Sequence, residues 1–405
     1  MILGSGAQGS TVARFMDKEP NVEKIICADY DPKAVEELVK ELTKGEGKQV
    51  DASSKKSIIA AAEGVDLIVN ALPLEYHPKV LKAALAVGAN YQDFATTDEF
   101  DDDWIECFRI LFNEYGPKFE AIGKTAIIGT GSAPGLICAA TRRAVRELDS
   151  CETIYNIVYE GVEAKRFIPF WWSPITALED MSEDAIAVEN GELITTPAFD
   201  LPITREYEYM GIGPVTLGEH NHDEPVHYWF NKDTYFKGVK NVYFKYGGAG
   251  YEFARPLFRS GLLSHKKIDV KGKRVKPFDV VYAILPPAPK YHDEIQEIIN
   301  EGLVTDTGCM VIEAYGLKNG EKTLVEVHVM APGLIESFER AGMTAEMYLT
   351  GQGGALYTKM FVEDQYHKKG LISSDMLSDE QVDYYFGEAA KLDITLEINI
   401  KPWED

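Results

Sequence analysis

Cysteine is scarce in this chain, and long apolar runs are absent. Its 405 residues include five cysteines, none of them in a C-x-x-C pair. This usage indicates reduced core thiols, and neither a disulfide framework nor a cysteine-based metal site. No segment approaches the roughly 20 apolar residues that a membrane-spanning helix requires. We therefore expect a cytoplasmic protein that has no membrane partner.

Basic residues are also few. Lys and Arg number 41 against 65 Asp and Glu, which gives a formal net charge of −24. Such a surface repels polyanions, so we expect no nucleic-acid partner. The hydrophobic content of 45% and the charged content of 26% are typical of globular proteins. The length is sufficient for two domains.

A glycine pattern opens the chain. Gly4, Gly6 and Gly9 form G-x-G-x-x-G within the first ten residues. In a dinucleotide-binding loop, the first glycine allows a tight turn out of a strand. The second lets the backbone approach a pyrophosphate, and the third lets the next helix pack on the sheet. Amide groups at the start of that helix face the phosphates. We predict that this loop, including Ala7 and Gln8, binds a dinucleotide.

An acidic residue follows at the expected distance. Asp29 ends the second strand, twenty residues after the last glycine of the pattern, where a carboxylate binds the ribose hydroxyls. Asp31 adds a second negative charge, and no Arg or Lys lies between Asp29 and Lys33. A 2′-phosphate would therefore be repelled, and we expect NAD as the cofactor in preference to NADP. Tyr30 is included among the cofactor-binding candidates. Residues 1–3 form a short first strand, which leaves open whether the natural chain starts upstream.

Strands and helices alternate over residues 1 to about 130. Short apolar segments that end near residues 3, 29, 51, 70, 93 and 128 predict strands, and amphipathic segments between them predict helices. Residues 44–48, Lys-Gly-Glu-Gly-Lys, are expected to form a turn before the third strand. Six strands with intervening helices predict a doubly wound α/β Rossmann domain over residues 1–132.

The ends of two predicted strands add cofactor-binding candidates. Asn70, Ala71, Leu72 and Pro73 follow the fourth strand, where a doubly wound sheet opens its crevice. We expect this backbone to run beside the ribose and nicotinamide of the cofactor; a plain strand-to-helix turn is the alternative. Asp51 is a candidate for binding the adenine amino group, or else a turn residue before the next helix.

The pattern changes after about residue 150. Residues 151–159 alternate between apolar and polar side chains, as in a strand with one exposed face. Asn190-Gly191 and Asn319-Gly320 separate strand-like runs and predict hairpin turns. These features predict an α+β second domain with a mostly antiparallel sheet.

Several motifs together resemble those of the saccharopine dehydrogenase and lysine 6-dehydrogenase superfamily along nearly the whole chain. Besides the glycine loop, the motifs are Val69–Pro73, Gly129–Leu136 (Gly-Thr-Gly-Ser-Ala-Pro-Gly-Leu), Ser173–Glu179 (Ser-Pro-Ile-Thr-Ala-Leu-Glu), the hairpin Glu189–Gly191 and Val275–Asp279. Leu371–Met376 departs from the saccharopine-specific pattern, in which a Pro-Glu pair is expected, and this departure leaves the substrate open.

The resemblance implies an inserted second domain, residues 133–344, for substrate binding and dimerisation, with residues 345–405 returning to complete the first. It implies an NAD(P)-dependent oxidoreductase that acts on a C–N bond of an amino acid or secondary-amine conjugate, with hydride transfer to nicotinamide, and a homodimer. L-lysine 6-dehydrogenase and a carboxynorspermidine-type dehydrogenase are alternatives. A catalytically inactive NAD-binding sensor or scaffold is the alternative from another class.

Residues 218–225 form the densest polar cluster in the chain. His220, His222 and Glu224 are the catalytic candidates there, because an imidazole or carboxylate can take the proton of an amine whose carbon is oxidised. The resemblance favours a loop that faces the substrate, and a solvated loop is the alternative. No cysteine or third histidine is placed to complete a metal site, so we expect no metal.

The remaining candidates are isolated in the sequence. His77 opens the helix after the fourth strand and is a further catalytic candidate, with a capping or packing role as the alternative. Lys165 and Arg166 both follow the end of a predicted strand. A guanidinium can bind a substrate carboxylate through two hydrogen bonds. With Glu219 they are the substrate-binding candidates; ordinary surface residues are the alternative.

Overall fold

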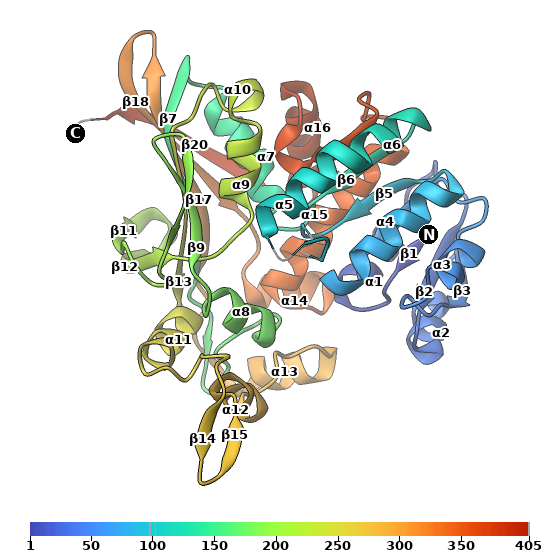
Figure 1. The fold of residues 1–405 in the computed structure, drawn as a ribbon, viewed down its shortest axis with the longest axis horizontal. Coiled ribbons are helices and arrows are strands. Elements are labelled where there is room, and N and C mark those ends of the chain that lie inside the picture. The colour runs from blue at the N-terminus through green and yellow to red at the C-terminus, as the bar shows by residue number, and fades with distance from the viewer. Residues whose placement is uncertain (97–98, 102, 404–405) are drawn as a thin grey trace. The chain divides into compact units, whose positions relative to one another are not determined.

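The computed structural model describes residues 1–96, 99–101 and 103–403. The chain forms two compact units, residues 1–139 with 349–392, and residues 140–348 with 393–405 (Figure 1). The first contains a parallel sheet and the second a mixed, mostly antiparallel sheet, which confirms the predicted α/β class with an α+β second part.

The sheet of the first unit has the strand order β19-β6-β5-β4-β1-β2-β3. Its strands are β1 (Ile2–Leu3), β2 (Ile25–Asp29), β3 (Gly45–Gln49), β4 (Leu67–Asn70), β5 (Asn90–Asp93), β6 (Thr125–Ile128) and β19 (Gly370–Ser373). The strand order reverses at β1, so the carboxyl ends of β1 and β4 lie at the switch point where doubly wound sheets bind ligands. The short β1 is a buried central strand, which pairs in parallel with both β2 and β4.

Helices pack against this sheet through small and branched side chains. In the first unit they are α1 (Ala7–Met16), α2 (Pro32–Lys40), α3 (Lys55–Ala61), η1 (Leu74–Tyr76), α4 (His77–Val87), α5 (Trp104–Ile110), η2 (Leu111–Tyr115), α6 (Gly116–Ala121), η4 (Ser374–Met376), α16 (Asp379–Ala389) and η5 (Ala390–Leu392). Helices α7 (Leu136–Val145) and α15 (Ala345–Val362) contribute residues to both units. Val12 and Met16 of α1 pack with Ile25 of β2 and Val69 of β4 in one buried cluster, which holds the glycine loop over the ends of the strands.

The third strand is displaced from its predicted position. Strand β3 covers Gly45–Gln49, most of which was expected to be a turn. The reason is close packing of α2 and of the residues that follow it on an edge strand. A Cβ added to Gly45 would lie 2.9 Å from the Leu42 side chain, and one added to Gly47 would lie 2.7 Å from Val35. The two glycines therefore serve helix–strand packing and not a reversal of the chain.

The C-terminal segment is divided between the units. Strand β19 pairs in parallel with β6 and adds a seventh strand to the six predicted. Strand β20 (Thr395–Pro402) pairs instead with β18 of the second sheet. The expectation that all of residues 345–405 complete the first domain is therefore wrong for residues 393–405. The alternation of Leu396 and Ile398 with polar residues suits an edge strand of a one-sided sheet.

The large sheet of the second unit has the order β10-β9-β13-β7-β17-β18-β20, and β12 pairs with both β11 and β13. Its strands are β7 (Ser150–Glu160), β9 (Ala185–Glu189), β10 (Glu192–Thr196), β11 (Ile203–Tyr207), β12 (Ile212–Glu219), β13 (Asn241–Gly248), β17 (Gly308–Lys318), β18 (Glu321–Met330) and β20. Both predicted hairpins are confirmed: Asn190 and Gly191 have φ values of 52° and 82°, and Asn319 and Gly320 have 54° and 82°.

Shorter elements complete the second unit. They are β8 (Glu163–Ala164), α8 (Pro174–Asp180), η3 (Glu208–Met210), α9 (Glu224–Phe230), α10 (Lys232–Tyr235), α11 (Ala249–Arg259), β14 (Ile268–Val270), β15 (Lys273–Val275), α12 (Pro277–Ile284), α13 (His292–Glu301), β16 (Leu303–Thr305) and α14 (Leu334–Ala341). None of the helices in the described part of the chain is long and apolar enough to cross a membrane.

Candidate functional site

The three glycines of the loop have different structural roles. A Cβ on Gly4, whose φ is +96°, would lie 2.6 Å from the Ala71 carbonyl oxygen, and one on Gly9 would lie 1.8 Å from the Gly4 carbonyl oxygen. Both glycines are therefore required by contacts within the protein. A Cβ on Gly6 would meet no described atom within 4 Å. The space above Gly6, at the uncapped start of α1, fits the approach of a phosphate to the first-turn amides.

Asp29 lies beside this loop. Its Oδ2 accepts a hydrogen bond of 2.6 Å from the Ser5 amide, and its Oδ1 accepts one of 3.0 Å from the Asp31 amide. These bonds orient the carboxylate at the end of β2, where the ribose of a bound dinucleotide is expected. The adjacent Tyr30 is 73% exposed. The Asp51 carboxylate accepts hydrogen bonds from the hydroxyl and the amide of Ser53, and these bonds lower the pKa of Asp51. Asp51 therefore acts as a turn residue before α3. Its contact with adenine stays a prediction.

The loop after β4 is held by two buried side chains. The Asn70 Oδ1 accepts a hydrogen bond from the Leu72 amide (3.3 Å), and the Asn70 Nδ2 donates to the Tyr91 hydroxyl (3.1 Å). The His77 Nε2 lies 3.0 Å from the Leu72 carbonyl oxygen, and its Nδ1 lies 3.5 Å from Asp93 Oδ2. His77 therefore holds the loop that ends at Pro73, and this geometry favours the packing alternative for His77.

The predicted histidine cluster lies at the end of β12 and is largely buried. His220 is 3% exposed, and Glu224 at the start of α9 is fully buried. The His222 Nδ1 lies 2.5 Å from Glu224 Oε2. Burial opposes the charge on His222, but the Glu224 carboxylate outweighs it and raises the pKa of His222 to about 9. Burial and the neighbouring His222 lower the pKa of His220. A solvated loop does not fit this burial.

Aromatic side chains of β13 hold the two imidazoles. The His220 ring stacks on Tyr246 with centroids 4.8 Å apart, and the His222 ring stacks on Phe244 at 4.0 Å with an interplanar angle of 5°. Because successive side chains of a strand point to opposite faces, Phe244 and Tyr246 share one face and Lys245 lies on the other. The imidazoles are thus fixed over one face of the sheet.

Further residues near the two histidines were not predicted from the sequence. They are Glu160, Trp172, Asp180, Tyr246 and Glu346. The Tyr246 hydroxyl and the Trp172 Nε1 donate to Glu160 Oε2, the latter at 3.2 Å. Burial raises the pKa of Asp180 at the end of α8 to about 7. Burial and repulsion from Glu160 raise the pKa of Glu346 in α15 to about 8. These residues come from distant segments, so no local pattern links them. We call the following set the acidic cluster: Glu160, Asp180, His222, Glu224 and Glu346.

The three candidate substrate-binding residues are not brought to the acidic cluster. Glu219 forms a buried ion pair with Lys245, at 2.6 Å, on the opposite face of β13. Arg166 binds Glu301 at 2.5 Å on the surface, and Lys165 is exposed. Lys165 and Arg166 thus match the surface alternative, whereas the buried ion pair of Glu219 matches neither the substrate-binding prediction nor its surface alternative. Among the described residues, no group of three or more His, Cys, Asp or Glu side chains is arranged to hold a metal ion.

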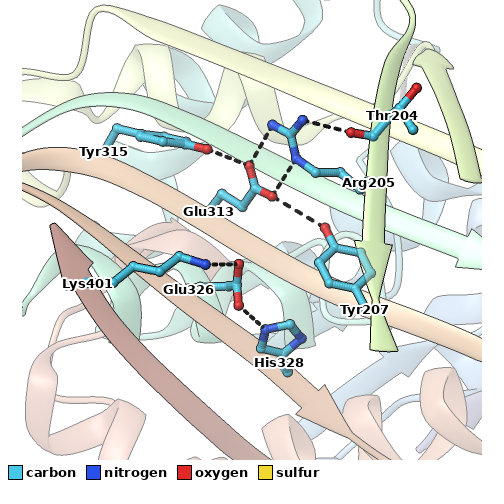
Figure 2. A network of polar contacts seen from close by, with 8 residues as sticks. All are labelled: Thr204, Arg205, Tyr207, Glu313, Tyr315, Glu326, His328 and Lys401. Carbon is cyan, nitrogen blue, oxygen red and sulfur yellow. Dashed lines mark hydrogen bonds and ion pairs between the residues drawn. The ribbon is translucent and has the colours of Figure 1, made fainter. Parts of the chain in front are cut away.

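A second polar network shows what satisfied buried carboxylates look like in this protein. Figure 2 shows Glu313 of β17 receiving two hydrogen bonds from Arg205, at 2.7 and 2.9 Å, and one each from Tyr315 (2.8 Å) and Tyr207 (3.4 Å). The neighbouring carboxylate of Glu326 is bound in the same manner by His328 and Lys401. Both carboxylates are fully engaged within the sheet, which indicates a structural role.

The first unit matches a known protein family. The family model of the saccharopine dehydrogenase NADP binding domain covers residues 1–125. The matched residues include all of β1 to β5 and the helices between them. The match includes the glycine loop, Asp29 and the loop after β4, so the predicted resemblance is confirmed for this part of the chain, and the motifs after residue 125 lie outside the match.

Comparisons over the whole chain find further similar proteins. The chain is 24% identical over 368 residues to carboxynorspermidine synthase of Vibrio alginolyticus, covering 88% of this chain and 83% of that protein. The structure resembles saccharopine dehydrogenase (L-Glu forming) from Saccharomyces cerevisiae, with a TM-score of 0.68, 14% identity and 99% of each chain covered. It also resembles homospermidine synthase from Legionella pneumophila in complex with NAD, with a TM-score of 0.66, 12% identity, and 99% and 90% covered. The saccharopine dehydrogenase fold extends through both units.

Proposed function

We propose that the protein is an NAD(P)-dependent oxidoreductase that acts on a C–N bond of an amino acid or a polyamine-type conjugate. The observation that carries this proposal is the buried His222–Glu224 pair within the acidic cluster, in a chain whose first unit has an open glycine loop beside Asp29. The names of the similar proteins, which are saccharopine dehydrogenase, carboxynorspermidine synthase and homospermidine synthase, support a substrate with amine nitrogen.

The first unit carries the residues that fit a dinucleotide. The first-turn amides of α1 above Gly6 would hold the pyrophosphate, and Asp29 would accept hydrogen bonds from the ribose hydroxyls. The backbone that Asn70 and His77 position would line the nicotinamide side. When bound, the nicotinamide supplies or accepts the hydride.

We propose NAD as the preferred cofactor. The carboxylates of Asp29 and Asp31 would repel a 2′-phosphate, and no basic side chain lies between Asp29 and Lys33 to offset them. The family is named for NADP, whereas the Legionella pneumophila structure contains NAD. Michaelis constants for the two cofactors test the preference, and equal or better use of NADP contradicts it.

The His222–Glu224 pair is suited to moving the proton of the amine nitrogen. With a pKa of about 9, His222 is protonated at neutral pH and can donate a proton to nitrogen as an imine is reduced. Above that pH the neutral imidazole can accept a proton from the amine as its carbon is oxidised. We therefore expect reduction of an imine to be favoured near neutral pH and oxidation of an amine to be favoured in alkaline solution.

Variants of this pair test the proposal. His222→Gln and Glu224→Gln are expected to lower turnover by about 10²–10⁴-fold while the affinity for the dinucleotide stays unchanged. His292→Gln is a matched control, because His292 also lies 3.2 Å from a carboxylate, Asp293, but is exposed. Wild-type turnover in both cluster variants contradicts the assigned role.

A carboxynorspermidine-type reduction of an imine conjugate is the specific form that we favour, because the Vibrio alginolyticus relative aligns with 88% of the chain. Assays with lysine, saccharopine and an imine conjugate distinguish this form from L-lysine 6-dehydrogenase and from a saccharopine-forming enzyme. Dinucleotide binding without turnover of any of the three supports instead the inactive sensor or scaffold.

We further propose that the protein is a homodimer joined through the second unit. Strands β10 and β20 end the order of its large sheet, and exposed sheet edges favour association with another chain. Light scattering after size-exclusion chromatography measures the mass in solution. A monomer at micromolar concentration contradicts the proposal.

A further inference from the structure

Three buried side chains at the carboxyl ends of β4 and β5 are joined by hydrogen bonds. Asn70 and Asp93 are register partners of the two parallel strands, and Tyr91 lies two residues before Asp93 on the same face of β5. The Asp93 Oδ2 accepts from the Tyr91 hydroxyl at 2.9 Å, and this hydroxyl accepts from the Asn70 Nδ2 at 3.1 Å. Each of the three residues is at most 2% exposed. We call Asn70, Tyr91 and Asp93 the relay.

The direction of every hydrogen bond in the relay is fixed by its two ends. The Asp93 carboxylate can only accept, and its Oδ1 is already bound by the Gly129 amide at 2.8 Å. Burial and the Asp93 charge raise the pKa of Tyr91, so its hydroxyl keeps the proton that it donates. At the other end the Leu72 amide can only donate, and it donates to Asn70 Oδ1 at 3.3 Å. The Asn70 side chain therefore has one orientation that satisfies both of its neighbours.

The relay ends on residues 70–73, the loop that would line the nicotinamide side. The Ala71 amide donates to the Leu3 carbonyl oxygen at 2.8 Å, and the Ala71 carbonyl oxygen is the atom that a Cβ on Gly4 would meet at 2.6 Å. The loop therefore lies directly beside the first glycine of the dinucleotide-binding pattern. Three hydrogen bonds in series connect this place to Asp93.

We propose that Asp93 is a positioning residue for the nicotinamide end of the bound dinucleotide. It acts through Tyr91 and Asn70 on the loop after β4, and it needs no contact of its own with the cofactor. His77 holds the same loop through the Leu72 carbonyl oxygen, and its Nδ1 lies 3.5 Å from Asp93 Oδ2. The role of Asp93 rests on the proposed function, which it deepens by naming the residue that sets the place of the nicotinamide-side loop.

The isosteric variant Asp93→Asn should break the relay at its far end. The introduced carboxamide must accept from the Gly129 amide with its oxygen, so its NH₂ group faces the Tyr91 hydroxyl. Tyr91 must then donate to Asn70, which turns the Asn70 oxygen away from the Leu72 amide. Asn70→Asp alone leaves Tyr91 between two carboxylates with one proton to donate. The double variant, Asp93→Asn with Asn70→Asp, reverses the bonds on both sides of Tyr91 and satisfies every group again.

Titration calorimetry of the full chain with NADH and with ADP-ribose, which lacks the nicotinamide, separates positioning from a general loss of structure. The wild-type protein should bind NADH at least about tenfold more tightly than ADP-ribose. Asp93→Asn and Asn70→Asp should each weaken NADH binding about tenfold and leave ADP-ribose binding within about twofold of the wild type, and the double variant should recover most of the NADH affinity. Asp66→Asn is the matched control, because Asp66 is exposed and precedes β4 at the opposite end of that strand. It should bind both ligands as the wild type does.

Hydrogen exchange in the unliganded protein gives a readout that does not depend on the cofactor. The Leu72 amide should exchange about tenfold faster in Asp93→Asn than in the wild type, because it loses its acceptor, and the double variant should restore slow exchange. Tyr91→Phe, which removes the middle of the relay, serves as the second variant if Asp93→Asn does not fold. It should show the same fast exchange and the same selective loss of NADH affinity.

Four results would overturn the positioning role and leave the proposed function intact. They are wild-type NADH affinity in Asp93→Asn or Tyr91→Phe, an equal loss of NADH and ADP-ribose affinity in these variants, no recovery in the double variant, and wild-type binding of NADH that is no tighter than that of ADP-ribose. A wild-type protein that binds neither ligand refutes the proposed function instead.

Discussion

Replacing Gly6 with alanine is expected to abolish tight dinucleotide binding without destabilising the protein. Gly6 has φ of −73° and ψ of −164°, an extended conformation that any L-residue adopts, and its added Cβ meets no described atom within 4 Å. The methyl group instead fills the space that a pyrophosphate needs. Loss of one or two hydrogen bonds to a charged group, at about 1.5 kcal/mol each, predicts affinity about 10- to 100-fold weaker.

The neighbouring Gly9 provides the contrast. A Cβ at Gly9 would lie 1.8 Å from the Gly4 carbonyl oxygen, far closer than the 3.0 Å that real Cβ contacts respect. The loop and α1 must therefore separate by roughly 1 Å, a distortion comparable to overpacking a core, which costs about 1–3 kcal/mol. Gly9→Ala is expected to lower both the free energy of unfolding and the affinity for the dinucleotide.

Titration calorimetry with NAD and NADH, together with chemical denaturation of the unliganded protein, separates these effects. Gly387→Ala in α16 is the matched control, because nothing lies within 4 Å of its added Cβ and it is far along the chain from the loop. This control should gain about 0.5–1 kcal/mol of stability and bind the dinucleotide as the wild type does. Wild-type affinity in Gly6→Ala, or wild-type stability in Gly9→Ala, would refute the reasoning.

Three further predictions concern single residues. Lys245→Met should lower the free energy of unfolding by about 3–5 kcal/mol in urea denaturation, because Glu219 is left buried without its cation, and Lys245→Met with Glu219→Leu should recover much of this loss. His222→Gln should destabilise the protein most below pH 6.5, by roughly 3 kcal/mol at most. The difference in stability should vanish as the pH rises through about 9, because the raised pKa of His222 stabilises the folded state only while the imidazole is charged. Asp29→Asn should weaken the preference for NAD over NADP by about tenfold in steady-state kinetics, and an unchanged preference would argue against a role of Asp29 in excluding the 2′-phosphate.

Local patterns predicted the glycine loop of the first unit and two hairpins of the second unit well. The glycine loop, the acid at the end of β2 and the two Asn-Gly hairpins each depend on a few adjacent residues, and the structure has them where the sequence places them. The same reasoning misassigned β3, because glycines at positions 45 and 47 suggest a turn unless the packing of Leu42 and Val35 against them is known. Strand β20 was misplaced for a similar reason, since an alternating strand does not specify which sheet it joins.

The acidic cluster was only half predictable. His222 and Glu224 are two residues apart and stand out as a polar group, so sequence reasoning found them. Glu160 and Glu346 are separated by nearly half of the chain, and each looks like an ordinary surface acid in its own segment. Their significance depends on burial and on mutual repulsion, which exist only after the sheet and α15 have come together. Glu219 shows the converse case, because its place beside the histidines conceals that it points to the other face of the sheet.

Transfer of deuterium from cofactor to substrate tests the central claim most directly. The protein is incubated at neutral pH with NADH deuterated at the transferable position and an imine conjugate of a primary amine, and the product is analysed by mass spectrometry. We predict one deuterium on the carbon bonded to nitrogen in the wild-type product, and much slower formation of this labelled product with Gly6→Ala at a cofactor concentration near the wild-type Kd. Tight NADH binding with no deuterium transferred to this imine, and no reduction of NAD by lysine or saccharopine, would contradict the account.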